Sequence, residues 1–350
     1  MAAETDPRHV AISYPVTPTV FATGLNNPRG LKFGPDGGLY VAEGGTGGPL
    51  ATNPAECAQV PAPVGPYTGS PVGSRISRID DRGNRRTVVD NLPSSQTNAD
   101  QGSLVSGVAD VAFIGRTLYA VLAGAGCSHG VPDIPNGVIR IHQDASWEVI
   151  ADLGAYQRTH PVANPEPDDF EPDGTWYSMV AVRGELFALE PNHGELVRIS
   201  TAGKVTRVID ISASQGHVVP SALAFYKNKF YIGDLRTFPI QEGSSSLYTV
   251  TTDGSISVFA TGLTTVLGVA VDWKGRVYAL ENTTGNPFPT PGTGRVVRVT
   301  PSGGLQVIAQ GLVLPTAMTF GPDGDLYVSD TGFGPPPVGL GRVMRVEIDD

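Results

Sequence analysis

Four histidines fall in segments that connect predicted strands: His129, His160, His193 and His217. His193 comes just after Glu190 in the phrase EPNHGEL, and His217 begins the next predicted repeat in QGHVVP. Because neighbouring repeats would bring these two imidazoles together, we expect them to bind a transition metal or to act as a general base oriented by Glu190 or Asp234. The alternative is that each imidazole only satisfies backbone groups where loops are long.

An acidic residue ends the second predicted strand in five of six repeats. These residues are Glu43, Glu190, Asp234, Glu281 and Asp330. A ring of such carboxylates could hold one divalent cation (calcium, magnesium or zinc), with His193 and His217 as further ligands. An acid at this position can also simply accept backbone N–H groups of the following turn. Both interpretations stay open.

Other polar residues occupy positions near the predicted channel. Asp110 stands in GVADVAF where the other repeats have Gly, Met or Ala, so it is either a ligand or a group bonded to neighbouring backbone. Arg29 would pair with Asp110 or clamp a substrate carboxylate. We expect further substrate contacts from Tyr177, Arg236 and Asn282.

The segment 164–177, NPEPDDFEPDGTWY, gathers acidic residues between prolines. They are Glu166, Asp168, Asp169, Glu171 and Asp173. Clustered carboxylates suit calcium, but the alternating spacing and the glycine of a calcium-binding loop are absent. A solvated acidic loop is the alternative.

The elements that must position these residues repeat along the chain. A short apolar phrase around an aromatic residue occurs six times: GLYVAE, TLYAVL, ELFALE, KFYIGD, RVYALE and DLYVSD. Each is preceded by one short apolar run across a tight turn and followed by a third, and all but the last also by a fourth; these runs are rich in Val, Ile and Tyr. Four strands in each of six units predict an all-β, six-bladed β-propeller with four-stranded antiparallel blades.

The sixth unit ends after its third strand, and the missing strand lies at the other end of the chain. The phrase PTVFATGLNNPRG at 18–30 matches SVFATGLTTVLG at 257–268, which contains a fourth strand. We therefore expect residues 19–25 to complete the last blade and close the ring. The predicted organisation is a tail, 1–18, and a single propeller domain, 19–350.

Long segments and tight turns separate onto opposite faces of this predicted ring. Turns between strands one and two, and between three and four, are short, as in GPDG, RGE and KNK. The long inserts, including 44–73 and 155–176, all emerge on the other face. We therefore expect function on the long-loop face.

The order of phrases resembles the ScyD/ScyE family over nearly the whole chain. The relevant stretches include YSMVAVRGELFALEPNHGELVRIS, GHVVPSALAFYKNKFYIGDL and FATGLTTVLGVAVD. The resemblance implies a secreted or periplasmic bacterial propeller related to NHL-repeat proteins, and it carries no established catalytic residues. An even count of two cysteines in a chain whose look-alikes are exported favours a Cys57–Cys127 disulfide over two free thiols.

Composition excludes several classes of function. The formal net charge of -10 and the absence of basic clusters argue against nucleic-acid partners. No apolar run approaches the length of a membrane span, and the start MAAETDPRHV has no leader pattern, so any export signal has been removed. No phosphate loop, dinucleotide fingerprint or Gly-x-Ser-x-Gly elbow is present, so no nucleotide cofactor is expected.

Together these features predict an exported monomer that acts on a small polar organic molecule at the channel mouth. The expected chemistry is metal-assisted or acid–base hydrolysis or elimination, by a lactonase-like or esterase-like hydrolase or a lyase. The alternative is a non-catalytic extracellular binding module or scaffold for a protein, a glycan or a pigment precursor.

Overall fold

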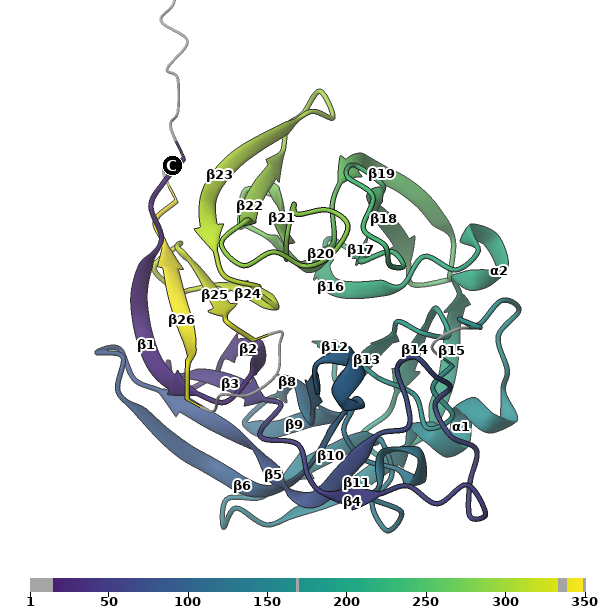
Figure 1. The fold of residues 1–350 in the computed structure, drawn as a ribbon. Coiled ribbons are helices and arrows are strands. Elements are labelled where there is room, and N and C mark those ends of the chain that lie inside the picture. Colours follow the sequence, from purple (N-terminus) through teal and green to yellow (C-terminus); the bar gives the residue numbers. More distant parts are fainter. Residues whose placement is uncertain (1–14, 168–169, 333–338, 349–350) are drawn as a thin grey trace, which may run out of the picture.

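Six four-stranded antiparallel blades form a closed ring, so the predicted β-propeller is confirmed (Figure 1). A computed structural model describes residues 15–167, 170–332 and 339–348. Within these residues, no helix has the length and apolar content needed to cross a membrane.

The blades follow the chain order, and each runs from an inner to an outer strand. The first has β2 (Pro28–Phe33), β3 (Leu39–Glu43), β5 (Thr68–Ile79) and β6 (Arg85–Gln96), with short additions β4 (Leu50–Ala51) and β7 (Val105–Ser106). The second has β8 (Val108–Ile114), β9 (Thr117–Leu122), β10 (Gly137–Ile141) and β11 (Trp147–Asp152). The third has β12 (Ser178–Val182), β13 (Glu185–Glu190), β14 (Glu195–Ile199) and β15 (Val205–Asp210).

The remaining blades repeat this order. The fourth has β16 (Pro220–Tyr226), β17 (Lys229–Asp234), β18 (Ser245–Thr251) and β19 (Ile256–Leu263). The fifth has β20 (Val266–Val271), β21 (Val277–Glu281), β22 (Gly294–Val299) and β23 (Leu305–Leu312). The sixth has β24 (Ala317–Phe320), β25 (Leu326–Asp330), β26 (Gly341–Val346) and, as its outer strand, β1 (Thr19–Leu25). The helical turns are η1 (Ala99–Gln101), η2 (Cys127–His129), α1 (Leu153–Thr159) and α2 (Ser212–Gln215).

Ring closure takes the form that the sequence predicts. β1 pairs with β26 in antiparallel register from Thr19 opposite Arg345 to Leu25 opposite Gly341, and Figure 1 shows the purple strand beside the yellow one. Val16 continues this contact by donating its N–H to Ile308 O of blade five over 2.7 Å. Residues from the two ends of the chain therefore share one sheet.

The apolar core lies between neighbouring blades, because each blade buries both faces against its neighbours. The repeated aromatic residue of the second strand packs edge-on against an aromatic side chain at the inner-strand end. Tyr40 meets Phe113 with ring centroids 4.9 Å apart, and Tyr327 meets Phe33 at 5.0 Å. These contacts align successive blades, so the inner strands surround one central channel.

The two copies of GPDG form turns on the tight-turn face. Gly37 and Gly324 have φ values of 76° and 90°, a left-handed conformation that glycine adopts without strain. The long connections emerge on the opposite face, as predicted. There the inserts of blades one and two are joined by the Cys57–Cys127 disulfide, with Cα atoms 6.2 Å apart, so the predicted disulfide is confirmed.

Candidate functional site

In three blades, the predicted metal-binding acid lies directly across the sheet from an arginine. The cross-strand pairs are Glu43 with Arg75, Glu281 with Arg295 and Asp330 with Arg342. All three carboxylates are fully buried, and the guanidinium groups contact them at distances that include 2.8 Å for the first pair and 2.6 Å for the third. Such pairs are charge-assisted hydrogen bonds that satisfy the buried charge.

Each of these acids also holds the loop that leads into its own blade. Glu43 accepts the N–H of Asn26 over 2.6 Å, Glu281 that of Thr264 over 2.7 Å, and Asp330 that of Val313 over 2.7 Å. In blade four, Asp234 similarly accepts the Ser246 N–H over 3.1 Å and the Tyr248 hydroxyl over 3.0 Å. Burial raises the pKa of Asp234 to about 6.

These contacts do not fit the predicted metal. Four of the five acids lie within ion-pair distance of an arginine, the fourth being Asp234 at 3.4 Å from Arg236, and a cation would have to displace a guanidinium group from each carboxylate. Among the described residues, no group of three or more His, Cys, Asp and Glu side chains is arranged to hold a metal ion. We therefore derive no chemical step through a metal.

Blade three departs from this pattern. At the position of the arginine it has Glu195, which lies directly opposite Glu190. Both side chains are fully buried, and burial raises the pKa of each carboxyl to about 7. Two facing carboxyl groups that titrate near neutral pH are an arrangement that occurs where proton transfer is needed.

Hydrogen bonds fix the orientation of both carboxyl groups. Glu190 accepts the N–H of Thr175 over 2.8 Å and the backbone N–H of His193. The Oε2 atom of Glu195 accepts Arg207 Nε over 2.6 Å. Its Oε1 atom is buried and has no hydrogen-bond partner within the part of the chain that the structure describes.

The predicted histidine pair lies beside these carboxyl groups. The Nε2–H of His193 donates to the carbonyl of Glu171 over 3.0 Å, and its ring stacks on Phe170 with centroids 5.0 Å apart. The Nε2 atom of His217 contacts the Glu166 carboxylate. Burial lowers the pKa of both imidazoles; at His217 the Glu166 carboxylate opposes this shift, and the charge of His193 adds to it.

The other two predicted histidines lie elsewhere. His129 is completely buried, with Nε2 3.2 Å from Oε2 of Glu171, whose Oε1 accepts the Tyr67 hydroxyl over 2.9 Å. His160 is exposed after α1 and stacks on Tyr156 at 4.2 Å.

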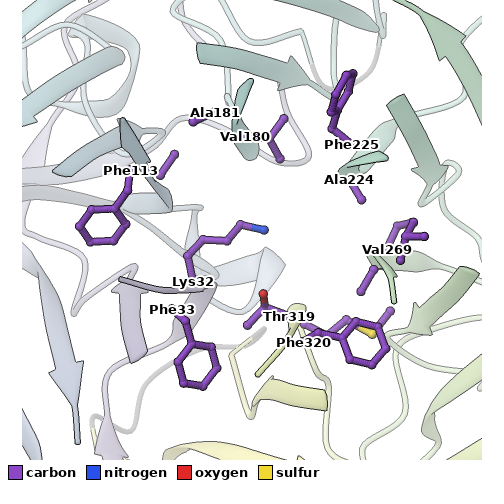
Figure 2. A pocket seen from close by; sticks show the side chains of 14 residues that line it. Lys32, Phe33, Phe113, Val180, Ala181, Ala224, Phe225, Val269, Thr319 and Phe320 are labelled. Atoms are coloured by element: carbon purple, nitrogen blue, oxygen red, sulfur yellow. The ribbon is translucent and has the colours of Figure 1, made fainter. Parts of the chain in front are cut away.

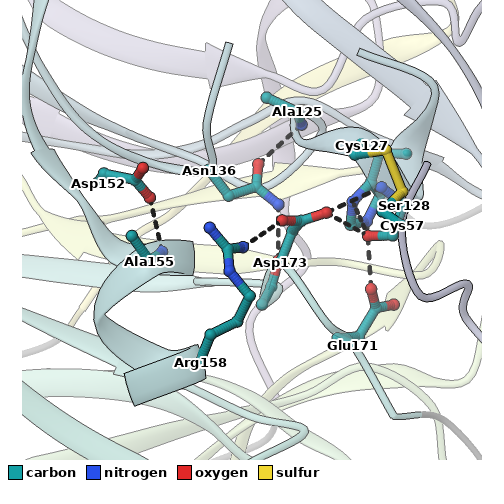
Figure 3. Close-up of polar contacts among 12 residues, drawn as sticks. Cys57, Ala125, Cys127, Ser128, Asn136, Asp152, Ala155, Arg158, Glu171 and Asp173 are labelled. Carbon is teal, nitrogen blue, oxygen red and sulfur yellow. Dashed lines mark hydrogen bonds and ion pairs between the residues drawn. A yellow bond between two sulfur atoms is a disulfide. The ribbon is translucent and has the colours of Figure 1, made fainter. Parts of the chain in front are cut away.

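The acidic segment 164–177 is held by a buried polar network (Figure 3). Asp173 accepts the Ser128 hydroxyl over 2.7 Å and lies 2.7 Å from a guanidinium nitrogen of Arg158. Asn136 donates to the carbonyl of Gly174 over 2.6 Å, close to the disulfide. Glu171 and Asp173 thus attach this segment to blade two and its inserts, whereas Asp168 and Asp169 lie outside the described residues.

The predicted substrate-binding residues meet protein groups. Arg29 donates to the carbonyl of Val105 and lies 3.4 Å from the Tyr177 hydroxyl, which in turn lies 3.4 Å from the Thr316 carbonyl. Since Tyr177 enters blade three and Thr316 enters blade six, this contact crosses the channel between opposite blades.

Asp110 lies on the channel wall next to Gly30 of the first inner strand. It accepts the N–H groups of Val111 and Met179, each over 2.8 Å, and Gly30 leaves room for it, because a Cβ there would lie 1.9 Å from Oδ1. Farther out, Arg236 donates to the Ser244 carbonyl over 3.0 Å.

Asn282 is buried at the end of blade five. Its side-chain amide donates to the carbonyl of Pro315 over 2.8 Å, and its backbone N–H donates to Thr265 O over 2.9 Å. Asn282 thus ties blade five to the segment that leads into blade six.

Two features of the site were not predicted from the sequence. The first is Glu195, and its signal is present: at the point opposite the acid, three other blades have Ser74-Arg75, Gly294-Arg295 and Gly341-Arg342, but blade three has Gly194-Glu195. The second is the partnership of His217 with Glu166, which lies 51 positions earlier, 217 minus 166, in a loop of unpredictable path.

Comparison with known proteins supports the fold. No family model and no curated protein match the sequence. Solved structures do match, among them a glucose dehydrogenase with TM-score 0.57 at 15% identity, covering 95% of this chain and 100% of that one. A provisionally assigned gluconolactonase gives 0.53 at 13% identity, covering 95% and 92%. A streptogramin B lyase gives 0.51 at 12% identity, covering 95% and 97%. At these identities the likeness shows the fold alone.

Proposed function

We propose that this protein is an enzyme that acts on a small polar organic molecule at the junction of blades three and four, by acid–base hydrolase or lyase chemistry. The observation that carries the proposal is Glu195, which stands where three other blades have arginine and faces Glu190, with His193 close enough to interact with it. Although Arg207 also contacts Glu195, burial raises the pKa of both carboxyl groups to about 7, so the pair can exchange protons near neutral pH.

His217 suits the role of general base. Glu166 binds its Nε2, while its buried Nδ1 has no hydrogen-bond partner among the described residues. A carboxylate on one nitrogen fixes the ring and its tautomer, and leaves the other nitrogen to take a proton. The lowered pKa keeps the imidazole neutral, and therefore basic, at neutral pH.

The carboxyl pair suits the role of general acid. Because burial raises the pKa of Glu190 and Glu195 to about 7, a proton remains available on the pair at neutral pH. The activity should therefore show a bell-shaped pH profile. It falls at low pH when His217 gains a proton, and at high pH when the carboxyl pair loses its own.

The site is proposed to function outside the cytoplasm, in a protein of the ScyD/ScyE type. The disulfide between Cys57 and Cys127 supports an oxidising compartment, and the whole-chain resemblance supports the family. The named structural neighbours include a lyase and a gluconolactonase, which supports the reaction class.

Turnover on a panel of lactones, esters and lyase substrates tests the proposal. His217→Gln and Glu195→Gln should each lower the rate by roughly 10²- to 10⁴-fold, the usual contribution of a general acid or base. His142→Gln is the matched control, because His142 is an exposed imidazole 3.4 Å from Glu148 in blade two. Equal rates in all variants would contradict the assignment of these roles.

A non-catalytic binding module is the second candidate. It is favoured by the ion pairs between arginine and the acids of blades one, five and six, because acids paired in this way have a structural role. It predicts no turnover on the panel by the wild-type protein. It also predicts that a partner binds the long-loop face with an affinity that His217→Gln and Glu195→Gln leave unchanged.

A further inference from the structure

A cavity of about 370 Å³ opens on the tight-turn face, at the end of the channel opposite the candidate site. Its wall is formed by residues near the ends of the six inner strands, and Figure 2 shows the rings of Phe33, Phe113, Phe225 and Phe320 turned away from the lumen. The volume lies within the range of about 300–1,000 Å³ that is typical of pockets for small organic ligands. No part of the proposed acid–base chemistry uses this cavity.

Most side chains of the residues that line the cavity are apolar. Of the 14 described residues that line it, Lys32 is the only charged one, and Thr319 is the only other one with a polar side chain. Figure 2 shows the Lys32 side chain extending from the wall into the lumen. A ligand that fits this lining needs an apolar body and one anionic group.

Lys32 has no direct ionic partner in the part of the chain that the structure describes. Its charge acts on Asp110, whose oxygens already accept the N–H groups of Val111 and Met179. The ammonium group is therefore free to form a charge-assisted hydrogen bond with a ligand. Asp110 behind it disfavours a second negative charge on that ligand.

We propose that this cavity binds a monoanionic organic carboxylate with an apolar body, the carboxylate on Lys32 and the body against the alanine and valine side chains of the wall. The apolar body would displace water from the walls, and the ammonium group would fix its orientation. This site lies on the opposite face from the His217 cluster and is independent of it.

Isothermal titration with octanoate tests the proposal, with octanamide and octylamine as probes of the same chain length. Octanoate should bind most tightly. Lys32→Met, which keeps the length of the side chain and removes the charge, should weaken octanoate binding by roughly ten- to hundredfold, as expected for one charge-assisted hydrogen bond. Octanamide binding should be unaffected by this change. Lys204→Met is the matched control, because Lys204 is exposed in the turn between β14 and β15 on the same face.

A second variant keeps the test decisive if Lys32→Met does not fold. Ala224→Met narrows the cavity and leaves Lys32 in place, so it should weaken octanoate and octanamide alike. The proposal is overturned by no octanoate binding to the wild-type protein, by equal affinity in Lys32→Met, by octylamine binding as tightly as octanoate, or by unchanged affinities in Ala224→Met.

Discussion

Asp110→Asn should change how the stability of the propeller depends on pH. Asp110 is buried in the channel wall, and burial raises its pKa from 3.8 to about 6, although the charge of Lys32 and two backbone N–H groups oppose the shift. Between about pH 4 and pH 6 the folded protein therefore holds a proton that the unfolded chain releases. Because the folded state binds more protons in this window, its stability falls as the pH rises through it.

The size of the effect follows from the shift itself. A difference between 3.8 and about 6, at 1.36 kcal/mol for each pKa unit, corresponds to about 3 kcal/mol. Below about pH 4 Asp110 imposes no such penalty, and above pH 6 the penalty is complete. The other buried acids with raised pKa values remain in both proteins, so their contributions cancel in the comparison.

Urea unfolding of the wild-type protein and Asp110→Asn at pH 4 to 8 measures this difference. In the variant, the amide NH₂ group of asparagine faces one of the two backbone N–H groups that now donate to Asp110, and this lost hydrogen bond lowers stability at every pH. The absolute stability of the variant is therefore not the criterion. The criterion is the change with pH: relative to the variant, the wild type should lose about 3 kcal/mol between pH 4 and pH 7.

Asp144→Asn provides a control of opposite sign. Asp144 is exposed, and hydrogen bonds from Ser146 lower its pKa, so the wild type should gain stability relative to this variant as the pH rises. A pH-independent difference for Asp110→Asn, or one of the same sign as for Asp144→Asn, would refute the assignment of a buried, proton-holding Asp110.

Two further predictions concern the covalent and non-covalent closures of the ring. Replacing both Cys57 and Cys127 by Ser should lower the free energy of unfolding by up to about 4 kcal/mol in denaturant titrations, because the bridge closes a loop with a sequence separation of 70; a change below about 1 kcal/mol would contradict this. Deleting residues 1–25 removes β1 and exposes the edge of β26, so light scattering should show association; a monomer of unchanged melting temperature would contradict it.

The fold was predictable because the sequence pattern of a blade is repeated in each of the six units. The aromatic phrase around Tyr40 or Tyr327 and the turn GPDG recur with the period of a blade, and the match between 18–30 and 257–268 indicates ring closure. These are local patterns of short strands, and strand pairing in a propeller follows the chain order. The structure confirms both the blades and the closing strand.

The site was less predictable because it depends on register and on loop paths. Considering the acids alone suggests a metal ring, whereas aligning the third strands as well places Arg75 and Arg295 opposite their acids and Glu195 opposite Glu190. The contact of His217 with Glu166 depends on the course of a long loop, which no periodicity encodes.

The cavity was missed for a different reason. The expectation that function follows long loops directs attention away from the tight-turn face, where Lys32 projects into the lumen. The sequence shows a lysine in the first inner strand, but it does not show which way the side chain points.

Because the contacts of Tyr177 with Arg29 and with the Thr316 carbonyl cross the channel, we expect them to close the tight-turn cavity at its inner end. A molecule that enters from the tight-turn face would then leave by the same opening, so binding and release would share one route. Larger side chains at the opening should therefore lower the association and dissociation rate constants together and leave the equilibrium affinity nearly unchanged. Substitutions around Lys32 should instead change mainly the dissociation rate constant. Ligands of the two proposed sites would then bind and dissociate through opposite faces of the propeller, independently of each other.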